Sequence, residues 1–216
     1  MSKRVAAPDP AGRRLGMFFG AYFALVGILA PYMPLYFEHR GLTAVQIGLL
    51  MAMAQAMRMV GPNLWGWLAD RSGHRTLILR ATSLALVVSF ALLFFPGGFG
   101  FVFAAMALVN FFQTAQMPVA EALASAQLRG QADAASRYGR LRVMGSLAFV
   151  AVVLASGPLF DRVGMQAAVW VCIGLALLLL GASVRVVEHH AVELPHERVS
   201  VRARLREPRV RWFFAS

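Results

Sequence analysis

The sequence predicts an all-α membrane protein with six transmembrane helices. Hydrophobic residues make up 59% of the chain and charged residues only 14%, whereas soluble domains carry about 45–50% apolar and about 25% charged residues. Six apolar stretches are each long enough to cross a bilayer, which takes about 20 mostly apolar residues. Lys and Arg gather in alternate connections between these stretches, which is typical of multi-pass membrane proteins.

The six predicted spans follow one another with short polar or Gly/Pro-containing connections. They cover residues 15–37, 44–68, 76–95, 100–127, 141–159 and 165–187. The first span is not a signal peptide, because its apolar stretch exceeds about 7–15 residues and no small-residue cleavage pattern follows. The expected organisation is a cytoplasmic tail (1–14), a six-helix bundle (15–187), a basic cytoplasmic linker (188–211) and the start of a truncated seventh helix (212–216).

The positions of the basic residues predict the orientation of the bundle. Eighteen of the 21 Lys and Arg residues lie in or beside the N-terminal tail, the second and fourth connections and the C-terminal segment. The other three are Arg40 and Arg162, in the remaining connections, and Arg58, inside a span. Since cytoplasmic segments carry the excess of Lys and Arg, both termini are expected in the cytoplasm.

Several function classes are disfavoured by the same pattern. The net charge of +11 is confined to short connections, with no basic face interleaved with aromatic residues, so nucleic-acid binding is not expected. The single cysteine, Cys172, cannot form an intrachain disulfide or complete a zinc site. The histidines all lie outside the spans, which disfavours an intramembrane protease or metal site, and no phosphate-binding Walker loop is present. We therefore expect neither an enzyme nor a bound metal or cofactor.

A short motif occurs twice, once after the second span and once after the fifth. Residues 66–73 read Gly-Trp-Leu-Ala-Asp-Arg-Ser-Gly, and residues 157–164 read Gly-Pro-Leu-Phe-Asp-Arg-Val-Gly. Each copy follows the middle helix of a three-helix set, on opposite sides of the membrane, as in the inverted repeats of secondary transporters. A chance match of a common helix-ending turn is the alternative. The first copy suits a conformational loop of five residues: Gly66, Asp70, Arg71, Gly73 and Arg75.

Ionisable residues inside spans are costly and therefore candidate functional groups. Arg58 lies near mid-membrane and could hold an anionic substrate, or could serve a structural ion pair. Glu121 can pair with Arg142 of the next span, and such a pair can open to admit a polar substrate. Asn110 shares a face with Glu121, and Gln113 adds polarity to that helix. Weaker candidates for lining a cavity, with helix packing as the alternative, are Tyr22, Tyr32, Gln55 and Phe149.

Two segments carry a resemblance to a known family. The loop from Gly66 to Arg75 resembles the signature loop of the major facilitator superfamily, and departs from it at His74. Residues 118–122 and 138–146 resemble the lactose-permease-like branch, in which the residues matching Glu121 and Arg142 hold substrate. Sugar-binding members have a tryptophan at the position of Phe149. Residues 41–50 and 142–150, together with Arg58, are similar to 3-phenylpropionic acid transporters.

This resemblance implies the N-terminal six-helix half of a twelve-helix carrier, arranged as a 3+3 inverted repeat. It also implies proton-coupled uptake of a small organic solute such as an aromatic carboxylate, by alternating access, across a bacterial-type inner membrane. The implied partners are the small-molecule substrate, membrane lipid, and a missing C-terminal half or a second copy. The alternative is a transport-inactive fragment or a half-transporter.

Overall fold

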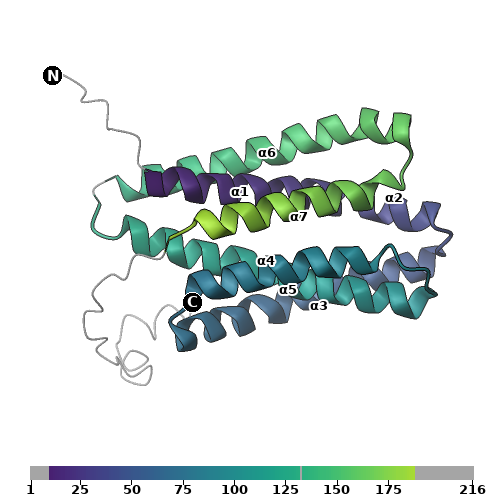
Figure 1. The fold of residues 1–216 in the computed structure, drawn as a ribbon, viewed down its shortest axis with the longest axis horizontal. Helices are drawn as coiled ribbons and strands as arrows, with labels where there is room; N and C mark the ends of the chain where they lie inside the picture. The colour runs from purple at the N-terminus through teal and green to yellow at the C-terminus, as the bar shows by residue number, and fades with distance from the viewer. Residues whose placement is uncertain (1–9, 132, 188–216) are drawn as a thin grey trace, which may run out of the picture.

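The computed structural model describes residues 10–131 and 133–187, which form seven α-helices packed lengthwise in one bundle (Figure 1). No β-strand occurs within these two ranges. The helices are α1 (Pro10–Leu29), α2 (Tyr32–His39), α3 (Ala44–Ser72), α4 (Arg75–Leu92), α5 (Phe99–Leu128), α6 (Ala134–Val163) and α7 (Ala167–Arg185). All of them except α2 are long and apolar enough to cross a membrane, so the predicted number of six spans is confirmed.

The first predicted span, residues 15–37, is wrong as a single helix. α1 ends at Leu29, the backbone turns at Ala30 and Pro31, and α2 begins at Tyr32. Pro31 has no N–H to donate and its ring clashes with the preceding turn, which favours a break in the helix at this point. Hydropathy does not register this break, because both sides of it are apolar.

Two helices begin five or more residues before the apolar segments that predicted them. α1 begins at Pro10 instead of Leu15, and α6 begins at Ala134 instead of Leu141. At the start of α6, Arg137 donates from Nε to Oδ2 of Asp133 at 2.9 Å, and this hydrogen bond lowers the pKa of the Asp133 carboxyl. Apolar length reports bilayer thickness and leaves such polar helical turns out. The predicted linker (188–211) and seventh-helix start (212–216) lie outside the described residues.

The helix packing has the symmetry of a 3+3 repeat. The first set is α1, α3 and α4, with α2 as an extension of α1, and the second set is α5, α6 and α7. The closest pairings are α1 with α6, α3 with α5, α4 with α5, α1 with α7, and α4 with α7. Exchanging the two sets converts α1–α6 into α5–α3 and α4–α5 into α7–α1, and leaves α4–α7 unchanged. The bundle is therefore the six-helix inverted repeat that the doubled motif predicts.

The α3–α5 and α1–α6 interfaces correspond to each other in this repeat, and each has a glycine at a point of close contact. On α3, a Cβ added at Gly61 would overlap Thr114 of α5. On α6, a Cβ added at Gly145 would overlap the ring of Phe23 on α1. Small residues let membrane helices approach closely and gain van der Waals contact. These glycines therefore set the spacing of α3–α5 and α1–α6.

Side-chain hydrogen bonds link the same pairs of segments. The indole Nε1 of Trp65 donates to the carbonyl of Phe111 at 2.9 Å, across α3 and α5. The hydroxyl of Tyr32, on α2, donates to the carbonyl of Val153 on α6 at 2.7 Å. Tyr32 thus holds two helices together, which is the packing alternative given for it above.

A buried polar cluster joins α4 and α5. The side-chain amide of Gln116 is fully buried, donates from Nε2 to Thr82 Oγ1 at 3.0 Å and accepts from Ser83 Oγ at 3.1 Å. Interhelical hydrogen bonds of this kind typically contribute under about 2 kcal/mol each. Gln116 is therefore part of the packing between these helices.

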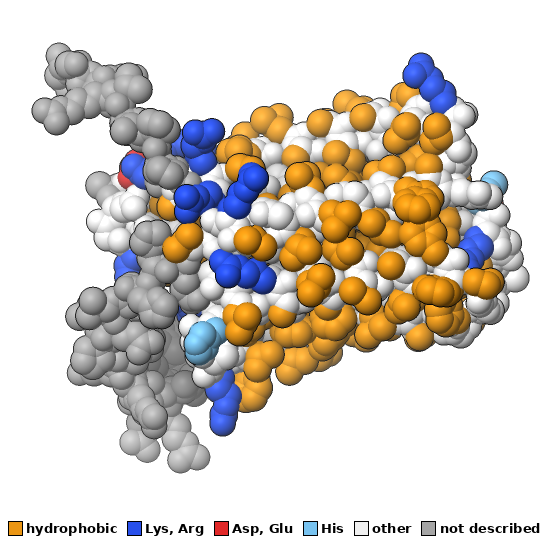
Figure 2. Space-filling view, viewed as in Figure 1, with side chains coloured by type: hydrophobic (Ala, Val, Ile, Leu, Met, Phe, Trp, Pro, Cys, Tyr) orange, Lys and Arg blue, Asp and Glu red, His pale blue; other side chains and the backbone are white. Residues whose placement is uncertain are grey.

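The two ends of the bundle differ in charge (Figure 2). Most Lys and Arg side chains in this view gather at the end where α1 begins, whereas hydrophobic side chains cover the middle. We call this the basic end. Its described arginines include Arg13, Arg14, Arg71, Arg75, Arg129, Arg140 and Arg185. The opposite end carries Arg40 and Arg162.

Candidate functional site

Three polar side chains meet where α5 faces α6. Arg142 donates from Nη1 to Oε1 of Glu121 at 3.0 Å, and the Tyr138 hydroxyl donates to the same oxygen at 2.9 Å. Tyr138 and Arg142 lie one turn apart on α6, so both face the same point on α5. The side chains of Arg142 and Glu121 are 51% and 37% exposed. The predicted Glu121–Arg142 pair is therefore formed, and it lies on an open surface.

Tyr138 belongs to this cluster although sequence reasoning did not single it out as a site residue. The signal was available, because Tyr138 and Arg142 are four residues apart and a helix places such residues side by side. The hydroxyl gives Glu121 a second donor. It therefore helps to fix the carboxylate independently of the arginine.

Arg58 is the middle residue of the 29-residue helix α3. Its Nη1 donates to Oε1 of Gln55, one turn away, at 3.3 Å. No carboxylate within the described ranges lies at ion-pair distance from Arg58. Four residues further on, Pro62 leaves the Arg58 carbonyl without its usual helical donor. The structure thus places an exposed cation, with no counter-ion among the described residues, halfway along a membrane-length helix.

Tyr22, on α1, is close enough to both of these groups to interact with their charges. The charges of both Arg58 and Glu121 act on its hydroxyl, so it is within electrostatic range of each. Its ring packs edge-on against Phe23, with the centroids 5.4 Å apart. The structure therefore associates the predicted residues Tyr22, Arg58, Glu121 and Arg142, which lie on four different helices. We call this surface the central wall.

Asn110 and Gln113 are not brought to the central wall. Both are buried, and Asn110 donates from Nδ2 to the carbonyl of Met106 on its own helix at 2.8 Å. Asn110 does share a face of α5 with Glu121, but eleven residues of helix separate them by about 16 Å. Their assignment as substrate ligands stays a prediction.

Phe149 lies two turns beyond Arg142 on α6 and packs on α1. A Cβ added at Gly27 would lie 3.1 Å from the Phe149 carbonyl oxygen and 3.5 Å from its ring Cδ2. Phe149 is only partly exposed. This contact supports a packing role, and a substrate contact by Phe149 stays a prediction.

The conformational loop between α3 and α4 is held by local contacts. Arg75 donates from Nη2 to Oδ1 of Asp70 at 2.9 Å, and the Arg71 guanidinium lies 5.4 Å from the centre of the Trp67 ring. Gly73 ends α3 in the left-handed conformation, with φ of +66°, which glycine adopts without steric cost. The loop is thus a compact, charged reversal at the basic end.

Both copies of the repeated motif end a helix in the same way. Like Gly73, Gly164 ends its helix at positive φ (+86°) and donates its N–H to the carbonyl four residues back, that of Phe160, at 2.9 Å. Gly66, which could admit a neighbouring helix, has no atom within 4 Å of the Cβ position in the described part of the chain.

Comparison with known proteins relates the chain to a family and to a curated permease. Residues 13–216 match the MFS_1 like family. The maltose permease of Geobacillus stearothermophilus is 30% identical over 168 residues, which cover 77% of this chain and 41% of that protein. The chain therefore spans about two fifths of the length of this curated relative.

Proposed function

The chain belongs to the MFS_1 like family, and from this premise we propose that it forms the first half of a secondary active transporter. Its six membrane-length helices and its permease relative favour a transporter over an intramembrane enzyme. Alternating access would be produced by rocking of two six-helix halves about a site near mid-membrane. The central wall would be one side of that site, and a second six-helix half would provide the other.

The positive charge of Arg58 at mid-helix is the observation that supports the choice of an anionic solute. The charges on the central wall are those of Arg58, Arg142 and Glu121, and the latter two form an ion pair. Arg58 is left as a net positive charge, and an uncompensated charge inside a bilayer is costly. A bound carboxylate would neutralise it. We therefore propose a small organic anion as the solute, with aromatic carboxylates such as 3-phenylpropionate as the leading class.

The Glu121–Arg142 pair suits a site that changes its partners during transport. A solute carboxylate can compete for the Arg142 guanidinium in bidentate geometry, while Tyr138 keeps a hydrogen bond to the released Glu121. Protonation of Glu121 would favour the same exchange by removing its attraction for Arg142. This supports the proposal of proton-coupled uptake, with the proton gradient as the energy source.

The relative's name raises a second candidate solute, a neutral disaccharide. Phe149 occupies the position at which sugar-binding members carry tryptophan, and it packs on Gly27. A neutral sugar would also leave Arg58 without a counter-ion. These two observations favour the anion.

Uptake assays in intact cells test the proposal. Cells producing the chain together with a second six-helix half should accumulate labelled 3-phenylpropionate and not maltose. Arg58→Gln should lower anion uptake at least about tenfold, as expected when an ion pair worth over about 1.4 kcal/mol is lost. Arg162→Gln, at the opposite end, is the matched control and should transport normally.

Three outcomes would contradict the proposal or part of it. Maltose uptake that survives Arg58→Gln would assign a neutral solute. Equal loss in Arg162→Gln would remove the special role of Arg58. Uptake by the chain alone, equal to that with the second half, would contradict the requirement for two halves.

A further inference from the structure

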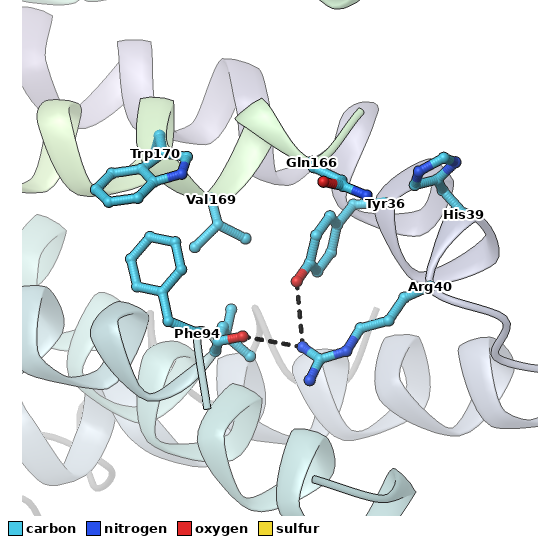
Figure 3. A pocket seen from close by; sticks show the side chains of 8 residues that line it. Tyr36, His39, Arg40, Phe94, Gln166, Val169 and Trp170 are labelled. Atoms are coloured by element: carbon cyan, nitrogen blue, oxygen red, sulfur yellow. Dashed lines mark hydrogen bonds between the residues drawn. The ribbon is translucent and has the colours of Figure 1, made fainter. Parts of the chain in front are cut away.

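A second site candidate is a pocket of about 310 Å³ at the opposite end of the bundle (Figure 3). It lies between α2, the end of α4 and the start of α7. Its lining includes Tyr36, His39, Arg40, Phe94, Gln166 and Trp170. None of these residues belongs to the central wall, and the proposed transport cycle makes no use of them.

One end of the pocket is cationic. Arg40 donates from Nη1 to the Tyr36 hydroxyl at 3.1 Å and to the Leu93 carbonyl at 3.0 Å, and from Nη2 to the Phe95 carbonyl at 3.2 Å. All three acceptors are uncharged. Within the described residues no carboxylate lies at ion-pair distance from Arg40. The guanidinium is thus fixed in position while its charge remains unmatched by an acid.

Two further polar groups flank this guanidinium. Figure 3 shows His39 and Gln166 at the same end of the pocket as Arg40. Gln166 is the N-cap residue of the 19-residue helix α7, and the N-terminus of a helix carries a partial positive charge. The polar end therefore combines a fixed cation, two polar side chains and a favourable helix dipole, which suits a phosphate group.

The other end of the pocket is aromatic and faces outward. The rings of Phe94 and Trp170 pack with centroids 4.3 Å apart, and Trp170 is 66% exposed. Trp170 shares an exposed row of α7 with Leu177 and Val184, at intervals of seven residues. This row would face lipid, and a tryptophan near its end has the position of an interfacial anchor. The pocket is therefore open to the side of the bundle that faces the bilayer.

We propose that this pocket binds the headgroup of an anionic phospholipid. The phosphate would lie against Arg40, His39 and Gln166, and the first acyl carbons would lie on Phe94 and Trp170. A free inorganic phosphate shares the polar chemistry, but it would leave the aromatic end without a partner. The amphipathic pocket and its outward opening therefore favour a lipid.

Trp170 is itself a reporter for the test. The full chain is placed in vesicles of phosphatidylcholine containing increasing fractions of phosphatidylglycerol, with bromine on the acyl chains of one lipid at a time to quench nearby indoles. Subtracting the signal of Trp170→Phe isolates Trp170. The wild type should prefer phosphatidylglycerol about fivefold, because one arginine near the surface contributes about that factor. Arg40→Gln should bring the ratio close to one.

A control variant outside the pocket and a second variant inside it complete the test. Arg162→Gln removes an arginine at the same end but outside the pocket, and should keep the wild-type ratio. If circular dichroism shows that Arg40→Gln does not fold, the double variant His39→Leu/Gln166→Leu replaces it and should lower the ratio at least twofold. Millimolar inorganic phosphate should leave the quenching unchanged.

Any of four results would overturn the lipid site. These are a wild-type ratio of one, a ratio unchanged in the folded pocket variant, an equal loss in Arg162→Gln, and displacement of lipid by inorganic phosphate. The last result would assign the pocket to a free anion. Solute uptake is not read in this assay, so the lipid site and the transport proposal can fail separately.

Discussion

At the scale of single residues, Glu121 is the point at which α5 and α6 interact through charge. One carboxylate oxygen accepts from both the Tyr138 hydroxyl and the Arg142 guanidinium. Both donors bind the same oxygen, so neither of them constrains the second carboxylate oxygen of Glu121. The carboxylate is therefore oriented, yet still able to accept another proton or donor.

Removing the Tyr138 hydroxyl tests how far that hydrogen bond orients Glu121, because the ion pair with Arg142 is kept. Tyr138→Phe should raise the KM for the solute about fivefold, because one neutral hydrogen bond contributes about 1 kcal/mol. Arg142→Gln should have a larger effect, since it removes a charge. Concentration-dependent uptake measures both.

Ser136→Ala is the matched control for Tyr138→Phe. Ser136 lies on the same helix and its hydroxyl accepts from Arg140 at 3.1 Å, away from Glu121. It should leave KM unchanged. An equal rise in KM for both variants would contradict a specific role for Tyr138.

The sequence predicts the pairing of charged residues more reliably than it predicts the position of polar residues along the helix axis. Glu121 and Arg142 follow from charge in neighbouring spans, and the structure pairs them. The prediction for Asn110 rests on its angular position around the helix, which it shares with Glu121. The angle does not include the distance along the helix axis, and this distance separates the two residues. The pocket around Arg40 could not be predicted, because its lining comes from three segments far apart in the chain.

At the scale of helices, the spacing of the two matched interfaces depends on Gly61 and Gly145. Alanine at either position should lower the free energy of unfolding by about 1–3 kcal/mol, because the added methyl overlaps Thr114 or Phe23. Unfolding in mixed detergent micelles measures the loss.

Gly66→Ala is the internal comparison for these two variants. It lies on the same helix as Gly61, has nothing within 4 Å of its Cβ position, and gains up to about 1 kcal/mol of helix propensity. It should therefore leave stability unchanged or slightly raised. Destabilisation equal to that of Gly61→Ala would show that the effect does not come from the α3–α5 contact.

The elements themselves were predictable because apolar length and the doubled motif are properties of local sequence. The predicted span 15–37 does not include the kink between α1 and α2, although its cause, Pro31, is visible in the sequence. Pro62, Pro118 and Pro158 lie inside helices that continue through them. Pro31 thus separates two helices, whereas Pro62, Pro118 and Pro158 are tolerated in helix interiors. The outcome depends on the neighbours that satisfy the freed backbone groups.

At the scale of the whole molecule, the charge difference between the two ends predicts orientation. Cys172 is the chain's single cysteine and is buried, so an introduced cysteine can be labelled selectively. Glu38→Cys, at the opposite end, should react with a membrane-impermeant maleimide in intact cells. Ser136→Cys, at the basic end, should react only after the membrane is permeabilised.

The same two variants also define the labelling pattern that would contradict this orientation. Labelling of Ser136→Cys in intact cells, with Glu38→Cys protected, would reverse the proposed orientation. The unmodified chain serves as the blank, since the buried Cys172 should not react in either condition.

The exchange symmetry of the helix pairings has a consequence for chain connectivity. α1 begins and α7 ends at the same end of the bundle (Figure 1), while α4 and α5 are joined at the other end by a short connection. A circularly permuted chain, opened between α4 and α5 and closed between α7 and α1, would give every helix its present neighbours. We therefore expect a chain permuted in this way to form the same helix pairings.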